Sequence, residues 1–213
     1  MSDSEIPSIN EVKFLLAAST IYGNLAKALG PDVAKLLDGS IIKELSKAFE
    51  SLSNHNLSST IMKIYEILNH ADWTLEELRL EYTRLFIKGE AHPYETSYDD
   101  PLRRTHILAD IAGFYRAFGM KPRGELPDYI NCELEFMALL CFKGAYALVH
   151  GLQKQYEVCL IALKKFIGEH LLRWLNHFKV YITKSAKLPI YPVLIELIYL
   201  FVSFHAERLS IKL

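Results

Sequence analysis

The chain has 213 residues, of which 51% are hydrophobic and 23% are charged, and its formal net charge is −1. This length suits one large domain over residues 1–213, and the apolar content is enough to bury a sizeable core. The near-balance of charge argues against a nucleic-acid partner, because non-specific nucleic-acid binding needs a basic surface.

Helical periodicity dominates the first half of the chain. Apolar residues from Val12 to Tyr22 recur every three or four positions, between a capping box formed by Ser8 with Glu11 and the Gly30-Pro31 pair. Shorter helices are predicted over residues 32–38, 40–52 and 57–69. A second capping box pairs Thr74 with Glu77, and it opens a helix that should end at Gly89.

The second half continues in the same way. The Asp100-Pro101 pair is typical of a helix start, and the helix that follows should end at Gly119 in the left-handed conformation. Further helices are predicted from Ile130 onward, over residues 153–184 and over residues 190–208. No useful stretch alternates as a β-strand does. The sequence therefore predicts an all-α, single-domain helical bundle of about eight to ten helices.

The ends of the chain carry no targeting or membrane signal that we recognise. The N-terminus reads MSDSEIPSINE, without the basic and apolar regions of a signal peptide. The most apolar segment, residues 190–204, is interrupted by Glu196 and is shorter than the ~20 residues of a bilayer span. We expect a cytoplasmic protein with no stable membrane insertion.

Catalytic and metal-binding motifs are missing from the sequence. There is no phosphate loop, no HExxH and no GxSxG. The three cysteines, Cys132, Cys141 and Cys159, show no CxxC spacing and are expected to be buried, reduced thiols. His170 and His177 lie two helical turns apart, too far to hold one ion alone, so we expect packing histidines and no metal site. The alternative hypothesis is a helical enzyme with a carboxylate/histidine metal site.

Two connections in the middle of the chain form the candidate site. They read GEAHPYETSYD at residues 89–99 and KPRGELPDY at residues 121–129. Nine acidic and five basic residues lie between Gly89 and Glu135, a local charge of −4. Acids beside tyrosines suit a partner that is both basic and apolar. The alternative is that the acids only cap helices and the tyrosines only pack.

Three stretches resemble redox-enzyme maturation chaperones of the TorD/DmsD/NarJ type. EYTRLFIKGEAHPYETSYDD (residues 81–100) is similar to the family's Leu-Phe pair, short loop, Pro-Tyr-Glu-Ser and Tyr. ELPDYINCELEFMALL (residues 125–140) is similar to its Pro-Asp-His-Ile helix start, and FIGEHLLRWLNHF (residues 166–178) is a looser match. The sequence departs from the pattern at Tyr129, where the family has histidine, and at Thr96, where it has serine.

The resemblance implies an all-α cytoplasmic chaperone and not an enzyme. Its partner would be the apo form of a molybdopterin oxidoreductase catalytic subunit, whose N-terminal leader, of the twin-arginine type, it holds until the cofactor is inserted. The family binds no cofactor beyond weak guanine-nucleotide binding, and its members are monomers or homodimers. A third hypothesis, compatible with this one, is an assembly protein that dimerises through aromatic surfaces.

The peptide-binding residues that the resemblance implies all come from the two connections and the helix start that follows them. They are Tyr94, Glu95, Tyr98, Pro127, Asp128, Tyr129 and Glu133. We expect these acids at the surface, where Asp128 and Glu95 would meet basic residues of the leader. On this view, replacing Asp128 should weaken binding and leave thermal stability nearly unchanged.

Overall fold

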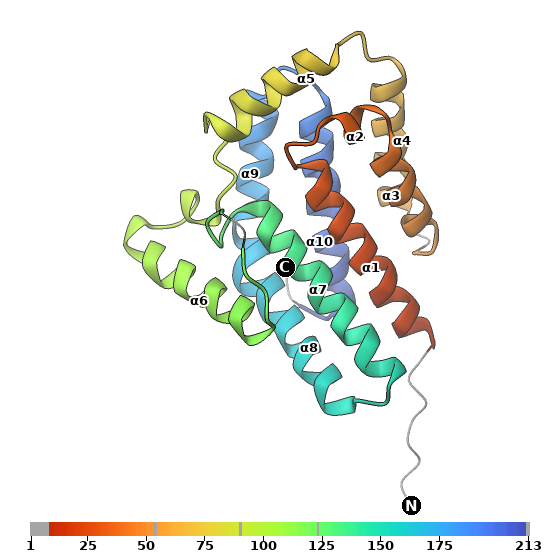
Figure 1. Cartoon of the computed structure of the whole chain (residues 1–213), viewed down its shortest axis with the longest axis vertical. Coiled ribbons are helices and arrows are strands. Elements are labelled where there is room, and N and C mark those ends of the chain that lie inside the picture. The colour runs from red at the N-terminus through yellow and green to blue at the C-terminus, as the bar shows by residue number, and fades with distance from the viewer. Residues whose placement is uncertain (1–8, 53–54, 90, 123, 212–213) are drawn as a thin grey trace, which may run out of the picture.

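The computed structural model describes residues 9–52, 55–89, 91–122 and 124–211. These residues form ten α-helices, which confirms the predicted all-α bundle (Figure 1). The helices are α1 (Ile9–Ala28), α2 (Ala34–Leu37), α3 (Ser40–Glu50), α4 (His55–Asn69), α5 (Leu75–Tyr82), α6 (Arg104–Ala117), α7 (Ile130–Val149), α8 (Gln153–Phe166), α9 (Leu172–Ser185) and α10 (Ile190–Arg208).

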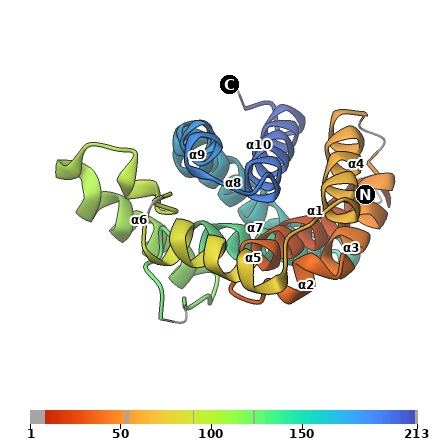
Figure 2. The ribbon, with the colours of Figure 1, turned by 90° about the horizontal axis from the view of Figure 1, so that it is seen from above.

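The helices form two main layers. Viewed from above, α1 and α7 lie in one layer and α9 and α10 in the other, while α6 stands apart at one side (Figure 2). Helices α1 and α7 run antiparallel, because Ser19 donates a hydrogen bond to the carbonyl of Ala138 and Asn131 donates to that of Ala26. Gly144 lets the two helices approach closely, since a Cβ there would lie 3.4 Å from Leu15 Cδ1.

Most of the predicted helix boundaries are confirmed. Thr74 and Glu77 form the reciprocal capping box, with Thr74 N–H donating to Glu77 Oε2 at 2.7 Å. Asp100 caps a short 3₁₀ turn, Pro101–Arg103, that leads into α6, and Gly119 adopts the left-handed φ of 76° after it. Ser8, the expected cap of the first helix, lies outside the described residues.

Two π-helical turns interrupt helices that the periodicity predicts to be continuous. Thr83–Ile87 extends α5, and Ile167–Leu171 joins α8 to α9 within the stretch predicted as one helix over residues 153–184. Such turns occur frequently at functional sites. Both of them supply side chains to the site described below.

Helix α10 is longer than the apolar segment measured from the sequence. At 19 residues it is the one helix among the described residues that is long and apolar enough to span a membrane. It packs against α9 and α4, and 56% of its most apolar window is buried. Its apolar side chains therefore pack in the core of the bundle.

All three cysteines are buried and unpaired, as predicted. Burial, followed by the negative charge of Glu135 and Glu125, raises the pKa of the Cys132 thiol to about 12. A thiol in this state is inert, because the thiolate is the nucleophile.

A buried histidine joins α10 to α1. His205 Nδ1 lies 3.0 Å from the Tyr22 hydroxyl, and both side chains are fully buried beside the ring of Phe14. Burial, assisted by the charge of Arg208, lowers the pKa of His205 to about 3. The ring is therefore neutral in the folded protein.

This neutral ring makes stability depend on pH. An unfolded His205 takes up a proton at its ordinary pKa of 6.5, whereas the folded one does so only near 3. The free energy of unfolding should therefore fall as pH is lowered through that window, by ~1.4 kcal/mol per pH unit at the steepest. Denaturant unfolding of wild type and His205→Asn, which keeps an acceptor for Tyr22, measures the contribution. The unfolding free energy of the variant should depend less steeply on pH than that of wild type, by up to the ~1.4 kcal/mol per pH unit that one bound proton contributes.

A control is His177→Asn, since the exposed His177 ring is in water in both states. It should leave the slope unchanged. An identical slope in wild type and His205→Asn would contradict the neutral buried histidine.

Candidate functional site

The two connections singled out in the sequence are joined by main-chain hydrogen bonds. Tyr94 and Tyr129 form an isolated antiparallel bridge. Glu95 N–H donates to the Asp128 carbonyl and Ile130 N–H donates to the Pro93 carbonyl, both at 3.0 Å. The tyrosine rings lie 5.3 Å apart. The structure thus brings together two segments that the sequence separates by more than thirty residues.

Asp128 belongs to the interior and not to the surface. Its side chain is fully buried, and Oδ2 accepts hydrogen bonds from the Thr96 amide at 3.1 Å and the Thr96 hydroxyl at 2.6 Å. The carboxylate therefore clamps one connection onto the other. Thr96, which stands where the related pattern has serine, keeps the hydroxyl that this clamp needs.

Glu95 is likewise buried, where it pairs with His170. Glu95 Oε2 lies 3.0 Å from His170 Nδ1, and Asp110 Oδ2 lies 3.2 Å from Nε2 on the other side of the ring. Each nitrogen of the His170 ring therefore has a carboxyl partner. His170 thus links the first connection, α6 and the π turn Ile167–Leu171, and it is a packing histidine with partners, as predicted.

Glu133 is the third buried acid. Its Oε2 accepts a hydrogen bond from Trp174 Nε1 at 3.2 Å, and the side chain is fully buried. Burial, together with the nearby negative charge of Glu95, raises its pKa well above the ordinary value. Burial therefore favours the protonated, neutral form of Glu133.

These observations correct the expected position of the acids. Asp128, Glu95 and Glu133 are 0%, 1% and 0% exposed, so none of them can meet a partner's basic side chain directly. Tyr98 is also engaged internally, since its hydroxyl donates to the Ala91 carbonyl and its ring stacks on Trp174.

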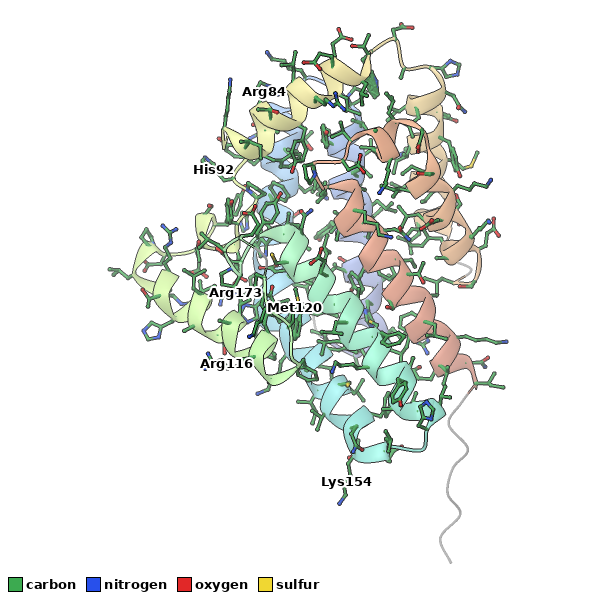
Figure 3. All side chains as sticks on the ribbon, in the orientation of Figure 1. Arg84, His92, Arg116, Met120, Lys154 and Arg173 are labelled. Atoms are coloured by element: carbon green, nitrogen blue, oxygen red, sulfur yellow. The ribbon has the colours of Figure 1, made fainter. Side chains whose placement is uncertain are left out.

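A groove of about 770 Å³ opens where the two connections meet. Tyr94 and Tyr129 line it, while Pro127 lines an adjoining hollow. The other lining residues come from α5 and its π turn, from the segment after α6 and from α7. They include Tyr82, Phe86, Ile87, Met120, Lys121, Glu125, Glu135 and Leu139. Met120 marks the place of this groove between α6 and α7 in Figure 3.

The π turn Thr83–Ile87 presents Phe86 and Ile87 to the groove. Arg84 anchors this turn: it donates to both oxygens of the buried Glu81 carboxylate, at 2.8 and 2.9 Å, and to the Ser185 carbonyl (Figure 3). Ile87 remains 67% exposed at the rim, so an apolar side chain is available there to a partner.

The charge of the groove comes from residues outside the predicted set. Glu125 and Glu135 are exposed and line the groove together with one base, Lys121. Their negative charge is felt by neighbouring groups, since Glu125 contributes, after burial, to raising the pKa of Tyr94. The sequence signal for these residues was the local excess of acids, which did not tell surface acids from buried ones.

The groove has a shape and a charge that could bind a partner, and we identify no catalytic group of side chains in it. Among residues 9–52, 55–89, 91–122 and 124–211, no group of three His, Cys, Asp or Glu side chains could hold a metal ion. His177, the second histidine of the metal-site alternative, is exposed on α9, away from the buried pair of His170 and Glu95.

Comparisons with known proteins agree with this picture. The family model described as nitrate reductase delta subunit matches residues 43–179, which include both connections. The chain is 29% identical over 210 residues to the perchlorate reductase assembly chaperone protein of Dechloromonas aromatica, covering 93% of this chain and 92% of that one. No solved structure matches the chain.

Two further relatives carry similar names. The selenate reductase assembly chaperone protein of Thauera selenatis is 32% identical over 146 residues, 64% of this chain and 72% of that one. The chlorate reductase assembly chaperone protein of Ideonella dechloratans is 32% identical over 111 residues, 49% of this chain and 56% of that one.

The Asp128 clamp predicts a loss of stability where the sequence alone predicted none. Asp128→Ala leaves the amide and hydroxyl of Thr96 without their acceptor inside the protein. The free energy of unfolding should fall by about 3 kcal/mol and the thermal midpoint by roughly 10 °C. Glu125→Ala, an exposed acid of the same connection, is the control and should change neither. An unchanged midpoint for Asp128→Ala would contradict the clamp.

The raised pKa of Glu133 predicts a pH dependence of stability opposite in sign to that of His205. Its stabilising contribution is complete below the unfolded pKa of 4.5 and is lost as pH rises toward the raised folded pKa. Glu133→Gln stays neutral and keeps an acceptor for Trp174. The unfolding free energy of the variant minus that of wild type should therefore increase with pH, by ~1.4 kcal/mol per unit. A difference that is constant from acidic to neutral pH would show that Glu133 is ionised when buried.

Proposed function

The chain belongs to the nitrate reductase delta subunit family of redox-enzyme maturation chaperones, and on this basis we propose that its groove binds the N-terminal leader of a client reductase. Members of this family are assembly chaperones and not catalysts. The single observation that carries the proposal is the acid-rimmed apolar groove where the two connections meet.

The groove has the chemistry that a basic, apolar leader requires. Tyr82, Phe86 and Tyr129 give an aromatic floor, and aromatic rings provide contact area at a low cost in conformational entropy. Glu125 and Glu135 stand at the rim, where a carboxylate can accept two parallel hydrogen bonds from one arginine. A leader of the twin-arginine type offers both features in one short segment.

The buried acids act in this proposal by positioning the groove. Asp128, through Thr96, and Glu95, through His170, hold the bridge between Tyr94 and Tyr129 in place. Pre-organised walls reduce the conformational entropy that binding would otherwise cost. The partner then meets Tyr94, Tyr129 and the outer acids, while the inner acids stay inside the protein.

The client we propose is the apo form of a molybdopterin oxidoreductase catalytic subunit. The relatives are named as assembly chaperones of perchlorate, chlorate and selenate reductases, so a reductase of that kind fits best. The chaperone would act in the cytoplasm, as a monomer or homodimer, and hold the leader until the cofactor has been inserted.

The rim acids provide the test. The client is first identified by co-purification from the native host, and a synthetic peptide of its leader is then titrated by calorimetry. The double variant Glu125→Gln/Glu135→Gln should bind the peptide about tenfold more weakly, because it loses two carboxylate partners. Its thermal midpoint should stay unchanged, since both side chains are exposed.

Glu44→Gln/Glu50→Gln is the matched control, because it removes two exposed acids of α3 and leaves the groove intact. It should bind the peptide as wild type does. Equal affinities for both double variants would remove the groove from leader recognition.

A further inference from the structure

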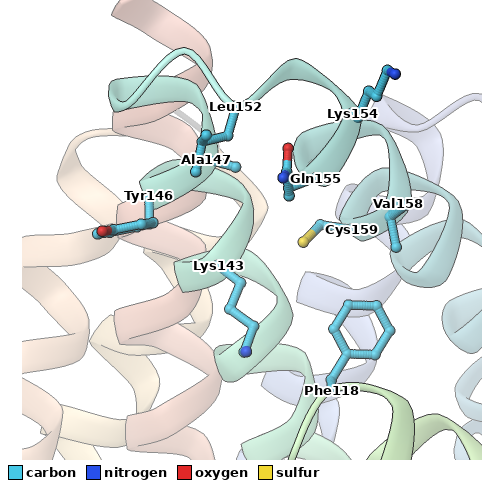
Figure 4. A pocket seen from close by; sticks show the side chains of 9 residues that line it. All are labelled: Phe118, Lys143, Tyr146, Ala147, Leu152, Lys154, Gln155, Val158 and Cys159. Atoms are coloured by element: carbon cyan, nitrogen blue, oxygen red, sulfur yellow. The ribbon is translucent and has the colours of Figure 1, made fainter.

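A second hollow lies on α7 beyond the leader groove. It measures about 500 Å³ and lies between α7 and α8, with Phe118 at one side (Figure 4). Its walls are largely apolar and include Tyr146, Leu152 and Val158, which are 38–55% exposed. We call this feature the α7–α8 hollow. Apolar side chains gathered in a concave surface are typical of a protein-docking site.

The groove and the hollow share the exposed stripe of α7. Asn131, Glu135 and Leu139 line the groove, and Lys143 and Tyr146 line the hollow. These residues follow one another at three- or four-residue steps, so they lie on one face of the helix. Leu139 and Lys143 are one helical turn apart, a rise of ~6 Å.

The wall opposite α7 also continues from the groove to the hollow. Phe118 lines the hollow and Met120 lines the groove, two residues apart at the end of α6. Between Leu139 and Lys143 the stripe also carries Phe142, which is 53% exposed. One segment bound along α7 could therefore contact the groove and the hollow without a break.

The charge reverses from one end of this surface to the other. The groove carries Glu125 and Glu135 against one base, Lys121. The hollow carries Lys143 and Lys154, and none of its described lining residues is acidic. A ligand complementary to both ends is basic in its first part and acidic in its second.

We propose that the α7–α8 hollow is a second docking surface, which takes an apolar, acidic segment of the client that directly follows its basic leader. The proposal rests on the proposed function, because it extends the same bound segment from the groove along α7. The leader would be recognised at Glu125 and Glu135, and the following segment at Lys143, Lys154 and the apolar walls.

The chemistry favours this occupant over two others. A second copy of the chain related by a twofold axis would bring the Lys143 and Lys154 patch against itself, which is repulsive. An anionic lipid surface attracts lysines, but it is flat, whereas Phe118, Val158 and Cys159 line a concavity.

Two peptides from the client and two double variants test the proposal. The short peptide ends with the leader, and the long one continues for about 18 residues, a helix of ~27 Å, which is long enough to run from the groove across the hollow. Lys143→Glu/Lys154→Glu reverses the charge of the hollow. Lys43→Glu/Lys63→Glu, on the exposed faces of α3 and α4, makes the same change of charge away from it.

Calorimetric titration should show that wild type binds the long peptide about tenfold more tightly than the short one. The hollow variant should lose this gain and keep the wild-type affinity for the short peptide, and the control variant should keep both. Equal affinities of wild type for the two peptides would overturn the proposal, as would a gain that persists in the hollow variant.

Two further outcomes would also overturn it. One is sedimentation of the wild-type chaperone, but not the hollow variant, with anionic phospholipid vesicles; the other is a change of oligomeric mass on charge reversal. Failure of the proposed leader binding can be distinguished from failure of the second docking surface, because wild type would then bind neither peptide.

Discussion

The contact of the buried His170 ring with the carboxyl groups of Glu95 and Asp110 is the interaction on which the rest of this site depends. The two connections and the start of α7 hold three buried carboxyl groups, and burying an unpaired charge is costly. Each group has its own environment: Glu95 contacts the His170 ring, Asp128 has the two donors of Thr96, and burial raises the pKa of Glu133. The contacts of Asp128 hold the two connections together, and Glu95 ties the first of them to the π turn that carries His170.

The division between inner and outer acids explains how one acidic segment can both hold the fold and recognise a partner. The inner acids fix the bridge of Tyr94 with Tyr129 and so shape the groove. Glu125 and Glu135, on the outside, give it a charge. Along α7 the charge changes sign at Lys143, so the two ends of this surface differ in charge. In the proposed function, this difference in charge would help to discriminate between leaders, because apolar contact alone discriminates poorly.

Much of the fold could be predicted from local sequence, and much of the site could not. Caps such as Thr74 with Glu77 and the left-handed Gly119 are decided by neighbouring residues, and they were predicted correctly. The partners of the acids are distant in sequence: Thr96 lies 32 residues from Asp128, and His170 lies 75 residues from Glu95. Nothing local tells a buried carboxylate from a surface one, so the expected surface positions of Asp128, Glu95 and Glu133 were wrong. The π turns were not predicted, because each is a single wide turn and the helical stretches on either side of it keep their own period.

The most direct test of the account asks where the leader lies on the wild-type surface. A photo-reactive amino acid at Ile87, exposed at the groove rim, is compared with one at Met62, similarly exposed on α4 away from the groove. The account predicts a cross-link from position 87 to the client's leader peptide and none from position 62. Cross-linking from Met62 at an equal yield, or no cross-link from Ile87 to a peptide that binds, would contradict it.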